Sequence, residues 1–466
     1  MSFESKRFQL AILVVLVVAM SYIVFYHLGK KPLLDYDESI YAQVARQAYE
    51  SRHQLGFTWY GNLGLNRTEL WFEKPPLMIW LTESAYWVFG VNEFAARFWP
   101  AIFGLLTMVL TFFFVKNISK SFYAAVFATS VFFIAFQYIY NLGVLQFDVP
   151  VGFFILLTLY AFWLAKANGK FYFLFWLSLG LGVLTKSVIG LLPLPVVLVY
   201  SILARDFAYL KSKLFYMAGL VFIVTILPWH IVESIKYGKG FWQQYLFYHV
   251  FDRYSSGLEG NGKPFSFYWN ILAEHRIMFR SLIVSLVYCA FKSFKDKNYF
   301  FPLAALLCIF IFFSTASTKL PAYILVIFPY IASVIGMAFA DFAGLLERYH
   351  KVLGGLFVFF VVVVFMFFGY KFNHFKLTKE KEQYVLDSRA VGAFLKSRYL
   401  DESLYYYSTI GTKPSIIFYS NRVVYYLPYP SPKPKEKLIL VSEISPDFKN
   451  QTVLFSTSTQ KVYQIQ

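Results

Sequence analysis

The segment Trp71-Phe72-Glu73-Lys74-Pro75-Pro76-Leu77 places a carboxylate, an ammonium and two prolines between long apolar stretches. Charge of this density is costly within a bilayer, so the segment is expected at a membrane surface. Proline is favoured in the first turn of a helix, and the proline pair therefore predicts the start of an interfacial helix. One interpretation is a solvated loop that only starts this helix. The other is a loop that presents Lys74 to an anionic ligand.

The composition of the 466-residue chain is typical of a polytopic membrane protein. Hydrophobic residues make up 58% of the chain and aromatic residues 22%, and the mean hydropathy is +0.53, above the usual range of soluble proteins. The formal net charge is +17, but the basic residues fall mainly in short segments between apolar runs. That placement orients spans, so no nucleic-acid partner is expected. Cys289 and Cys308 lie inside apolar runs and imply no disulfide framework.

Apolar runs of sufficient length predict about eleven transmembrane helices. The first run follows Lys6 and Arg7 and has no small-residue cleavage site, so we interpret it as a retained span rather than a signal peptide. The predicted spans are residues 8–26, 94–115, 122–140, 145–165, 171–185, 189–203, 214–232, 277–291, 299–313, 320–342 and 352–370.

Basic residues in the connecting segments predict the orientation of these spans. With the N-terminus inside, one face collects Lys116, Lys120, Lys166, Lys170, Arg205, Lys211, Lys213, Lys292, Lys295, Lys297, Arg348 and Lys351. The positive-inside rule makes that face cytoplasmic. The long loops 28–93 and 233–276 and the C-terminal tail then lie on the opposite face. We therefore expect a multi-pass protein of the cytoplasmic (inner) membrane with its chemistry on the extracytoplasmic (periplasmic) side.

The tail has the pattern of a small soluble α/β domain. A helix-like stretch at 384–399 precedes strand-like stretches at 403–408, 416–419, 422–426, 437–441 and 452–456, with a proline-rich break at 428–434. We therefore divide the chain into a transmembrane domain, 1–375, and an extracytoplasmic α/β domain, 376–466. The first outer loop is expected to carry interfacial helices.

Carboxylates stand at the start of two predicted helices. Asp37 and Glu38 follow the first span, and Asp148 opens the fourth. The helix dipole alone favours acids there, so capping is a sufficient explanation. A carboxylate held at the bilayer surface can instead take a proton from an acceptor hydroxyl. We therefore treat these three acids as candidate catalytic residues.

Two predicted outer turns each carry a single lysine among small polar residues, Lys186 in TKS (185–187) and Lys319 in STKLPAY (317–323). Lysines on the outer side oppose the positive-inside tendency, which weakens a purely topological explanation. An ammonium among hydroxyls suits a phosphate at headgroup depth. Neither turn has the pattern of a phosphate-binding P-loop, so no nucleotide cofactor is expected.

The second long loop contains His249 and Arg253, followed by Gly257, Gly260 and Gly262. The glycines allow close approach of the backbone to a ligand, and the arginine guanidinium can form a two-pronged contact with a phosphate. His249 is a candidate proton carrier or metal ligand, although a single histidine is usually neither. The chain has no HExxH or CxxC pattern, so the sequence signal for metal is weak.

Together these segments resemble the polyprenyl-phosphate-sugar glycosyltransferases of the GT-C fold. The similarity is greatest to the lipid A aminoarabinose transferases, and the protein O-mannosyltransferases are more distant. It is carried by DExxYAxxAR at 37–46, FEKPPLxxWL at 72–81, FGVNEFAAR at 89–97, LTK at 184–186 and KLPAY at 319–323. These motifs cover most of the membrane part in order, and FEKPPL is the most specific of them.

The resemblance implies transfer of one sugar from a polyprenyl-phosphate donor to lipid A or another envelope glycolipid, with inversion as the simplest outcome. It implies that Lys74 contacts the donor phosphate, that Tyr41 and Tyr323 line the same site, and that Asp37 is an essential acid. With the basic residues found above, the candidate donor-phosphate site comprises Lys74, Tyr41, Arg253, Lys319, Tyr323 and Lys186.

The resemblance also implies that Glu73 and His249 match a divalent metal site of some members. The chain departs from the family pattern at Ile40, where relatives often have arginine before the tyrosine, and at Trp71, where they often have tyrosine. The first change removes a potential phosphate or acceptor contact and leaves the acceptor open. Protein O-glycosylation is therefore one alternative. Transport of a polyprenyl-phosphate sugar is another, although charge is scarce within the spans.

Overall fold

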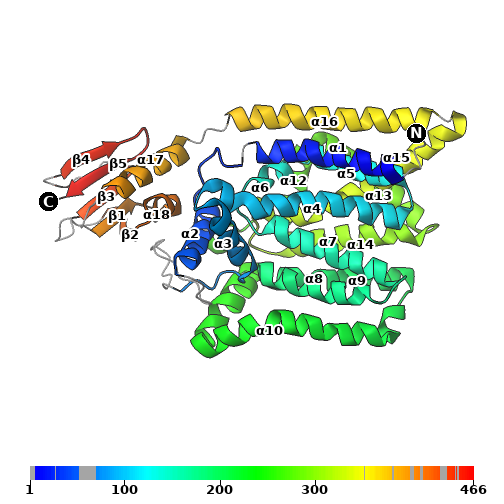
Figure 1. The fold of residues 1–466 in the computed structure, drawn as a ribbon, viewed down its shortest axis with the longest axis horizontal. Helices are drawn as coiled ribbons and strands as arrows, with labels where there is room; N and C mark the ends of the chain where they lie inside the picture. Colours follow the sequence, from blue (N-terminus) through cyan, green and yellow to red (C-terminus); the bar gives the residue numbers. More distant parts are fainter. Residues whose placement is uncertain are drawn as a thin grey trace.

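The computed structural model describes residues 6–26, 28–51, 70–350, 352–379, 383–398, 403–409, 413–430, 438–444, 446, 448 and 451–465. A bundle of long, roughly parallel helices forms one end of the molecule, and a small sheet domain forms the other (Figure 1). The chain begins at the far end of the bundle and finishes in the sheet domain. Between them lies a layer of shorter helices that includes α2 (Asp37–Glu50) and α3 (Leu77–Phe89).

Each predicted apolar span coincides with a helix or a helix pair. The bundle comprises α1 (Lys6–Phe25), α4 (Glu93–Ser119), α5 (Phe122–Val131), α6 (Phe136–Leu142), α7 (Asp148–Ala165), α8 (Phe171–Lys186), α9 (Pro193–Ala204), α10 (Lys213–Trp242), α13 (Arg276–Ser293), α14 (Phe300–Thr315), α15 (Phe328–Tyr349) and α16 (Leu353–Lys379). Between α10 and α13 lie a π-helical segment, η4 (Gln243–Asp252), and the short helices α11 (Arg253–Ser255) and α12 (Phe267–Glu274).

The chain is a multi-pass membrane protein, but the count of about eleven spans is not confirmed. Among the described residues, seven helices are long and apolar enough to cross a bilayer, or eight if a bent pair counts as one span. The remaining predicted spans correspond to α1, α9 and α13. The apolar part of α1 and the whole of α9 are shorter, and α13 carries Arg276 and Arg280.

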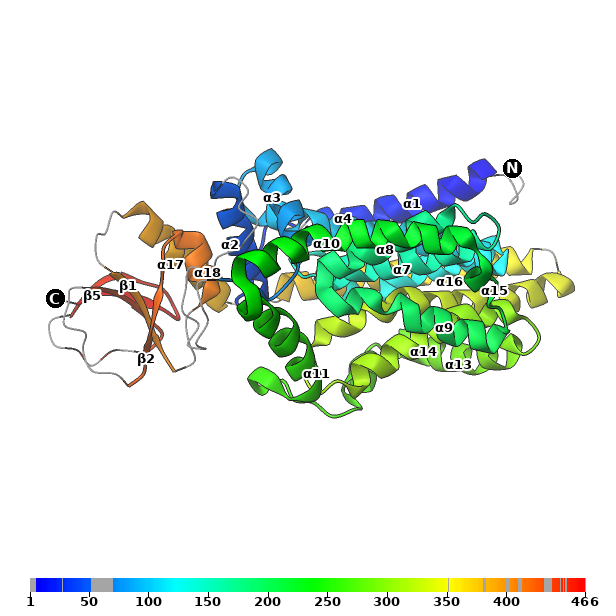
Figure 2. The ribbon, with the colours of Figure 1, turned by 90° about the horizontal axis from the view of Figure 1, so that it is seen from below.

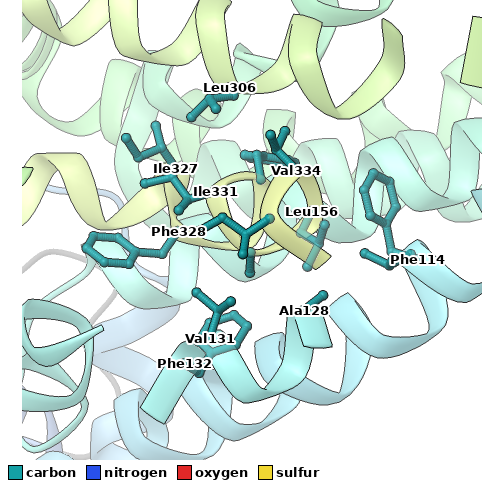
Figure 3. Packing of buried hydrophobic residues seen from close by; sticks show 14 of the residues in the cluster. Phe114, Ala128, Val131, Phe132, Leu156, Leu306, Ile327, Phe328, Ile331 and Val334 are labelled. Carbon is teal, nitrogen blue, oxygen red and sulfur yellow. The ribbon is translucent and has the colours of Figure 1, made fainter. Parts of the chain in front are cut away.

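The bent pair is formed by α5 with η1 (Phe132–Ile134) and by α6, whose axes differ by 74°. Its helices contact α15, α4 and α16, and Figure 3 shows Val131 and Phe132 near Phe328 and Ile331 in this core. At Gly336 of α15, an added Cβ would lie 2.6 Å from the carbonyl oxygen of Ala124 in α5. Glycine therefore permits the close approach of these two helices.

The C-terminal part is an α/β unit with a five-stranded sheet in the order β2-β1-β3-β5-β4. The strands are β1 (Ser403–Ser408), β2 (Tyr425–Pro428), β3 (Leu438–Ser442), β4 (Gln451–Ser456) and β5 (Lys461–Ile465). β1 pairs in parallel with β2 and β3, whereas β5 is antiparallel to β3 and β4. The prediction of a mixed helix and strand unit is confirmed.

The predicted strand at 416–419 is wrong, because these residues form the short helix α18 (Pro414–Ser420). A proline in the first turn starts this helix. Its apolar side chains are buried, but they belong to a helix and not to a strand of the sheet. The predicted helix at 384–399 corresponds to α17 (Gln383–Ser397), and β5 was not predicted. Helix α16 extends through Lys379, past the predicted boundary at 375, and the domain division itself stays a prediction.

Helix α18 joins the C-terminal unit to α2 and the segment before it. The Arg46 guanidinium in α2 donates a 3.0 Å hydrogen bond to the carbonyl oxygen of Phe418. The Tyr419 hydroxyl accepts from the Leu33 amide at 2.8 Å and donates to Glu93 Oε1 at 3.0 Å. Figure 2 shows α18 beside α2 at the junction of the two parts. These hydrogen bonds therefore fix the position of α2 and of the segment before it relative to the C-terminal unit.

Candidate functional site

Within the described residues of the first long loop, the start of α2 is anchored by a buried ion pair between Glu38 and Arg97. One edge of the guanidinium, Nε and Nη2, donates to the two carboxylate oxygens at 2.7 and 2.9 Å, and the Glu38 and Arg97 side chains are 1% and 3% exposed. Arg97 also donates to the carbonyl oxygens of Leu28, Lys31 and Pro32. The fold therefore fixes the start of α2 relative to α4 through this pair.

The same carboxylate accepts hydrogen bonds from the amides of Leu34 and Leu145. Its oxygens are therefore occupied by structural partners, and Glu38 is not among the residues that line either cavity described below. Its position does not support the predicted catalytic role, because a carboxylate saturated by an arginine and two amides is poorly placed to accept a proton. We assign Glu38 a positioning role for Asp37, its neighbour in the chain.

A cavity of about 790 Å³ lies between α2, the FEKPPL segment, α6, the start of α7 and η7 (Pro321–Ile327). It brings together six residues predicted from separate parts of the sequence: Asp37, Tyr41, Lys74, Asp148, Lys186 and Arg253. Tyr323 and Glu73 also line it. A single cavity thus collects most of the predicted site.

Three cations in this cavity each contact a carboxylate. Lys74 Nζ lies 2.9 Å from Glu73 Oε1, and Lys186 Nζ lies 2.5 Å from Asp148 Oδ1. Arg253 lies 3.0 Å from Glu259 Oε2 and donates to the Tyr323 hydroxyl at 3.2 Å. The Lys186 ammonium also lies 4.3 Å from the centre of the Tyr323 ring. The three cations therefore lie close to one another, each in an ion pair, and offer charge-assisted hydrogen bonds to an anionic ligand.

Asp148 is thus placed as the ion-pair partner of Lys186 at the first turn of α7. Helix α8 ends at this lysine because Ser187 adopts a φ of +53°, a conformation that residues with a Cβ adopt only at a cost. The break turns the chain into η2 (Ser187–Leu191). The strained backbone therefore presents Lys186 at the end of a transmembrane helix.

Asp37 lies at the first position of α2 and faces the cations. Burial raises the pKa of its carboxyl, and the neighbouring Glu73 carboxylate raises it further, whereas Lys74, Arg253 and Lys186 oppose that shift. A buried acid with a raised pKa next to cations is a recurrent property of proton-transferring groups. The structure therefore places Asp37 where proton transfer or stabilisation of positive charge is chemically reasonable.

Tyr41 lies one turn further along α2 and forms part of the same wall. Its ring stacks on Phe147 with 4.4 Å between centroids and meets Trp71 edge to face at 5.9 Å. Burial raises the pKa of the Tyr41 hydroxyl well above its ordinary value. The group is therefore a neutral hydrogen-bonding partner and not an anion at neutral pH.

The second long loop, 233–276, is hydrogen-bonded to the segment that contains Lys319. The amides of Thr318 and Lys319 donate to the carbonyl oxygens of Arg253 and Asn261, and the Lys319 ammonium contacts the carbonyl oxygens of Lys263 and Ala316. Lys319 lines neither cavity, and burial lowers the pKa of its ammonium. Its position does not support direct contact with a donor phosphate. It joins the loop to the segment before η7.

A second cavity of about 350 Å³ adjoins the first and shares Glu73, Lys74, Lys186, Arg253 and Tyr323 with it. The rest of its lining is mainly apolar and aromatic: Val188, Ile189, Tyr245, Val250, Phe251, Tyr254, Phe312, Phe313 and Ala316. The shared cations thus lie between a polar cavity and an apolar one. That arrangement fits an amphipathic ligand whose charged group lies at the shared residues.

Glu73 and His249 both line the smaller cavity. In the part of the chain that the structure describes, no group of three or more His, Cys, Asp or Glu side chains is arranged to hold a metal ion. The Glu73 carboxylate also forms an ion pair with the Lys74 ammonium. The pair therefore supplies two potential ligands, and the divalent metal stays a prediction.

Several residues of the larger cavity were not predicted, among them Asp35, Gln137, Asn141, Gln146 and Glu259. Asp35 and Gln146 lie two residues before Asp37 and Asp148, so proximity to a predicted acid was an available signal. Gln137 and Asn141 lie on α6, which follows the 74° bend. No sequence pattern that we recognised marks that bend.

Comparison with protein families gives a match over residues 7–241 to the family described as dolichyl-phosphate-mannose-protein mannosyltransferase. An uncharacterized protein of Aquifex aeolicus (strain VF5) is 30% identical over 71% of this chain and 63% of its own length. The undecaprenyl phosphate-alpha-4-amino-4-deoxy-L-arabinose arabinosyl transferase 2 of Pseudomonas fluorescens (strain Pf0-1) is 27% identical over 72% of this chain and 60% of its own length. The chain thus matches less than two thirds of the length of these relatives.

Among solved structures, ArnT from Cupriavidus metallidurans bound to undecaprenyl phosphate matches with a TM-score of 0.78 and 18% identity, covering 97% of both chains. The oligosaccharyltransferase of Archaeoglobus fulgidus in the apo form gives a TM-score of 0.66 at 13% identity, covering 92% of this chain and 65% of that one. At these identities the similarity concerns the fold, which is the predicted GT-C architecture.

Proposed function

We propose that this chain, which belongs to the dolichyl-phosphate-mannose-protein mannosyltransferase family, is a membrane glycosyltransferase. In this proposal it moves one sugar from a polyprenyl phosphate to lipid A or another envelope glycolipid. The observation that carries the proposal is the position of Lys74, Lys186 and Arg253 between a polar and an apolar cavity. A polyprenyl phosphate has this combination of an anionic head and an apolar tail.

The chemistry follows from the charges in the larger cavity. Breaking the bond between sugar and phosphate develops negative charge on the phosphate, which fixed cations stabilise more in the transition state than in the ground state. The sugar carbon develops positive charge, which the Asp37 carboxylate can stabilise. The same carboxylate can instead remove the proton of an acceptor hydroxyl. An anionic acceptor such as a phosphate needs no base.

We propose a single displacement in which the acceptor oxygen forms a bond to the sugar carbon as the bond to phosphate oxygen breaks. The polyprenyl phosphate leaves with the bonding electrons, and the sugar carbon is inverted. We also propose that the cavities and the C-terminal unit face the extracytoplasmic side of the inner membrane. The basic segments at the other end of the helices support this orientation.

Replacing Lys74 with alanine is expected to lower the rate of transfer about 10²-fold, because one fixed cation at the leaving phosphate is lost. The measurement uses purified protein in detergent with undecaprenyl phosphate carrying 4-amino-4-deoxy-L-arabinose and lipid A, with mass spectrometry of the product. Lys263→Ala is the matched control, because Lys263 is an exposed lysine of the second outer loop that lines neither cavity. Equal rates in both variants would contradict the role of Lys74.

Protein O-glycosylation is a second candidate function, favoured by the family match itself. It would require the base function of Asp37, because serine and threonine hydroxyls must lose a proton. Incubation of the protein with labelled donor and a whole envelope fraction separates the two. Label in the lipid extract supports the first proposal, and label in the protein fraction supports the second. Label that only crosses a liposome bilayer, with no acceptor modified, would favour a transporter.

The pH dependence of transfer provides a further prediction. If Asp37 acts as a carboxylate, kcat/KM falls as the pH is lowered through its pKa, which burial and Glu73 raise above the ordinary aspartate value, about 3.9. The acid limb is therefore expected above that pH. Glu73→Gln should move the limb to lower pH because it removes a carboxylate that raises the pKa. A flat profile between about pH 4 and pH 8 would contradict an essential Asp37 carboxylate.

A further inference from the structure

The chain enters α2 through a backbone conformation that glycine favours and that tyrosine adopts at a cost. The φ and ψ angles of Tyr36 are +62° and −119°, the combination of the first central position of a type II′ turn, where glycine predominates. A residue directly before a helix usually has extended backbone instead. Because Tyr36 precedes Asp37, its ψ angle sets the direction in which the backbone enters the first residue of α2.

The side chain of Tyr36 does not account for this conformation. It caps no backbone amide of α2, and the residue is 49% exposed. Packing of the ring is therefore not what maintains the positive φ. Strained backbone persists only where the surrounding structure fixes it from more than one side, so the cause lies in the neighbouring residues.

Hydrogen bonds fix the chain around Tyr36. The Leu34 amide donates to Glu38 Oε2 at 2.7 Å, and this bond spans the turn. The C-terminal unit supplies the second contact, because Asp35 Oδ1 accepts from the Ser415 amide at 3.1 Å and from the Ser415 hydroxyl. Ser415 lies in the first turn of α18, which packs beside α2 (Figure 2). Tyr36 is thus held between the buried Glu38 on one side and α18 on the other.

We propose that Ser415 is a positioning residue for Asp37. Its hydrogen bonds to Asp35 stabilise the strained conformation of Tyr36, and that conformation directs the Asp37 carboxyl into the larger cavity. No described residue of the C-terminal unit lines either cavity, so Ser415 acts only through the segment before α2. The proposal rests on the proposed glycosyltransferase function and extends it to a residue outside both cavities.

The backbone preference of residue 36 makes this role testable. Without the contact to Ser415, Tyr36 is free to relax to a negative φ, which residues with a Cβ prefer, and the Asp37 carboxyl then moves relative to Lys74 and Arg253. Glycine populates positive and negative φ about equally. A protein with glycine at this position therefore depends less on the contact to Ser415.

The experiment measures the effect of Ser415→Ala in three backgrounds: wild type, Tyr36→Ala and Tyr36→Gly. Both substitutions of Tyr36 remove the ring, but only glycine removes the strain. Ser420→Ala is the matched control, because Ser420 is a buried serine of the same helix whose hydroxyl has no hydrogen-bond partner among the described residues. Purified full-length protein in detergent gives kcat for sugar transfer and the Kd for undecaprenyl phosphate.

Ser415→Ala is expected to lower kcat about tenfold in wild type and in Tyr36→Ala, because a hydrogen bond to a carboxylate is lost. In the Tyr36→Gly background the loss should be less than about twofold. The Kd for undecaprenyl phosphate should not change, and Ser420→Ala should match wild type. Equal losses of kcat in the glycine and alanine backgrounds would overturn the proposal. So would a parallel weakening of lipid binding, because Ser415 would then support the fold in general.

Hydrogen–deuterium exchange tests the same coupling without turnover. The amides of Ser39 and Ile40 donate to the carbonyl oxygens of Leu34 and Tyr36, so a loosened turn exposes them to exchange. Ser415→Ala should speed exchange of these two amides in wild type and in Tyr36→Ala, and less so in Tyr36→Gly. Unchanged exchange in Ser415→Ala would contradict the proposal. A wild-type protein that transfers no sugar but shows this exchange pattern would instead contradict the proposed function.

A second variant keeps the test open if melting temperatures show that Ser415→Ala is misfolded. Tyr419→Phe removes the hydroxyl of α18 that accepts from the Leu33 amide at 2.8 Å. It loosens the same segment from the same helix, and the same dependence on residue 36 is expected. Equal effects of Tyr419→Phe in the glycine and alanine backgrounds would then overturn the proposal.

Discussion

The Asp37→Asn variant is expected to lose about 10⁴-fold in transfer rate to a hydroxyl acceptor, at the upper end of the usual contribution of a general base. Asparagine has nearly the same shape, so the first turn of α2 and the cavity should be retained. The loss arises because an amide neither accepts the proton nor carries the negative charge that would stabilise the sugar in the transition state. Initial rates with saturating donor and acceptor measure the effect.

The folded protein should tolerate this change. Burial and Glu73 raise the folded-state pKa of Asp37 above its unfolded value. The corresponding stability is therefore fully present below the unfolded pKa and is lost as the pH rises through the folded pKa. At neutral pH the ionised carboxylate is a net cost, so Asp37→Asn should melt at or above the wild-type temperature. A large fall in melting temperature would attribute the lost activity to unfolding and contradict a chemical role.

Arg97→Leu is expected to have the largest effect on stability. The substitution leaves the Glu38 carboxylate buried without its partner and removes the hydrogen bonds to three carbonyl groups of the first loop. Breaking one side of a buried ion pair costs about 3–5 kcal/mol. Thermal unfolding in detergent, followed by a fluorescent thiol- or tryptophan-based readout, measures the loss.

Two comparisons make this prediction specific. Lys166→Ala breaks the surface ion pair with Asp206, whose side chains are 31% and 38% exposed, and should cost only about 0–1 kcal/mol. The double variant Arg97→Leu with Glu38→Leu removes both charges and should recover part of the stability, because no buried charge is left unpaired. An Arg97→Leu protein as stable as Lys166→Ala would contradict the organising role of the pair.

The parts of the molecule that follow from local sequence were predictable. Apolar runs located the helices of the bundle because burial in lipid requires continuous hydrophobic stretches. Lys74, Asp37 and Tyr41 were recognisable from the FEKPPL and DExxY motifs, and the structure brings them to one cavity. Asp148, Lys186 and Arg253 were found from isolated charges near the ends of spans. Their roles in the reaction stay predictions.

The features that depend on tertiary contacts were not predictable. Asp37 and Glu38 are adjacent acids at the start of one helix, so the local sequence does not distinguish them. Only the ion pair of Glu38 with Arg97, 59 residues further along the chain, indicates that Glu38 has a structural role. Lys319 is turned towards carbonyl groups of a distant loop. Residues 416–419 have the composition of a strand but pack as a helix against α2, because tertiary contacts override β propensity.

The contacts between α18 and α2 have a consequence for engineering of this protein. Leu33 and Arg46 donate hydrogen bonds to α18, and the carboxylates of Asp35 and Glu93 accept hydrogen bonds from it. The C-terminal unit is therefore not an interchangeable module. A chimera that takes this unit from a relative would keep a correctly formed cavity only if the α2 segment came from the same parent.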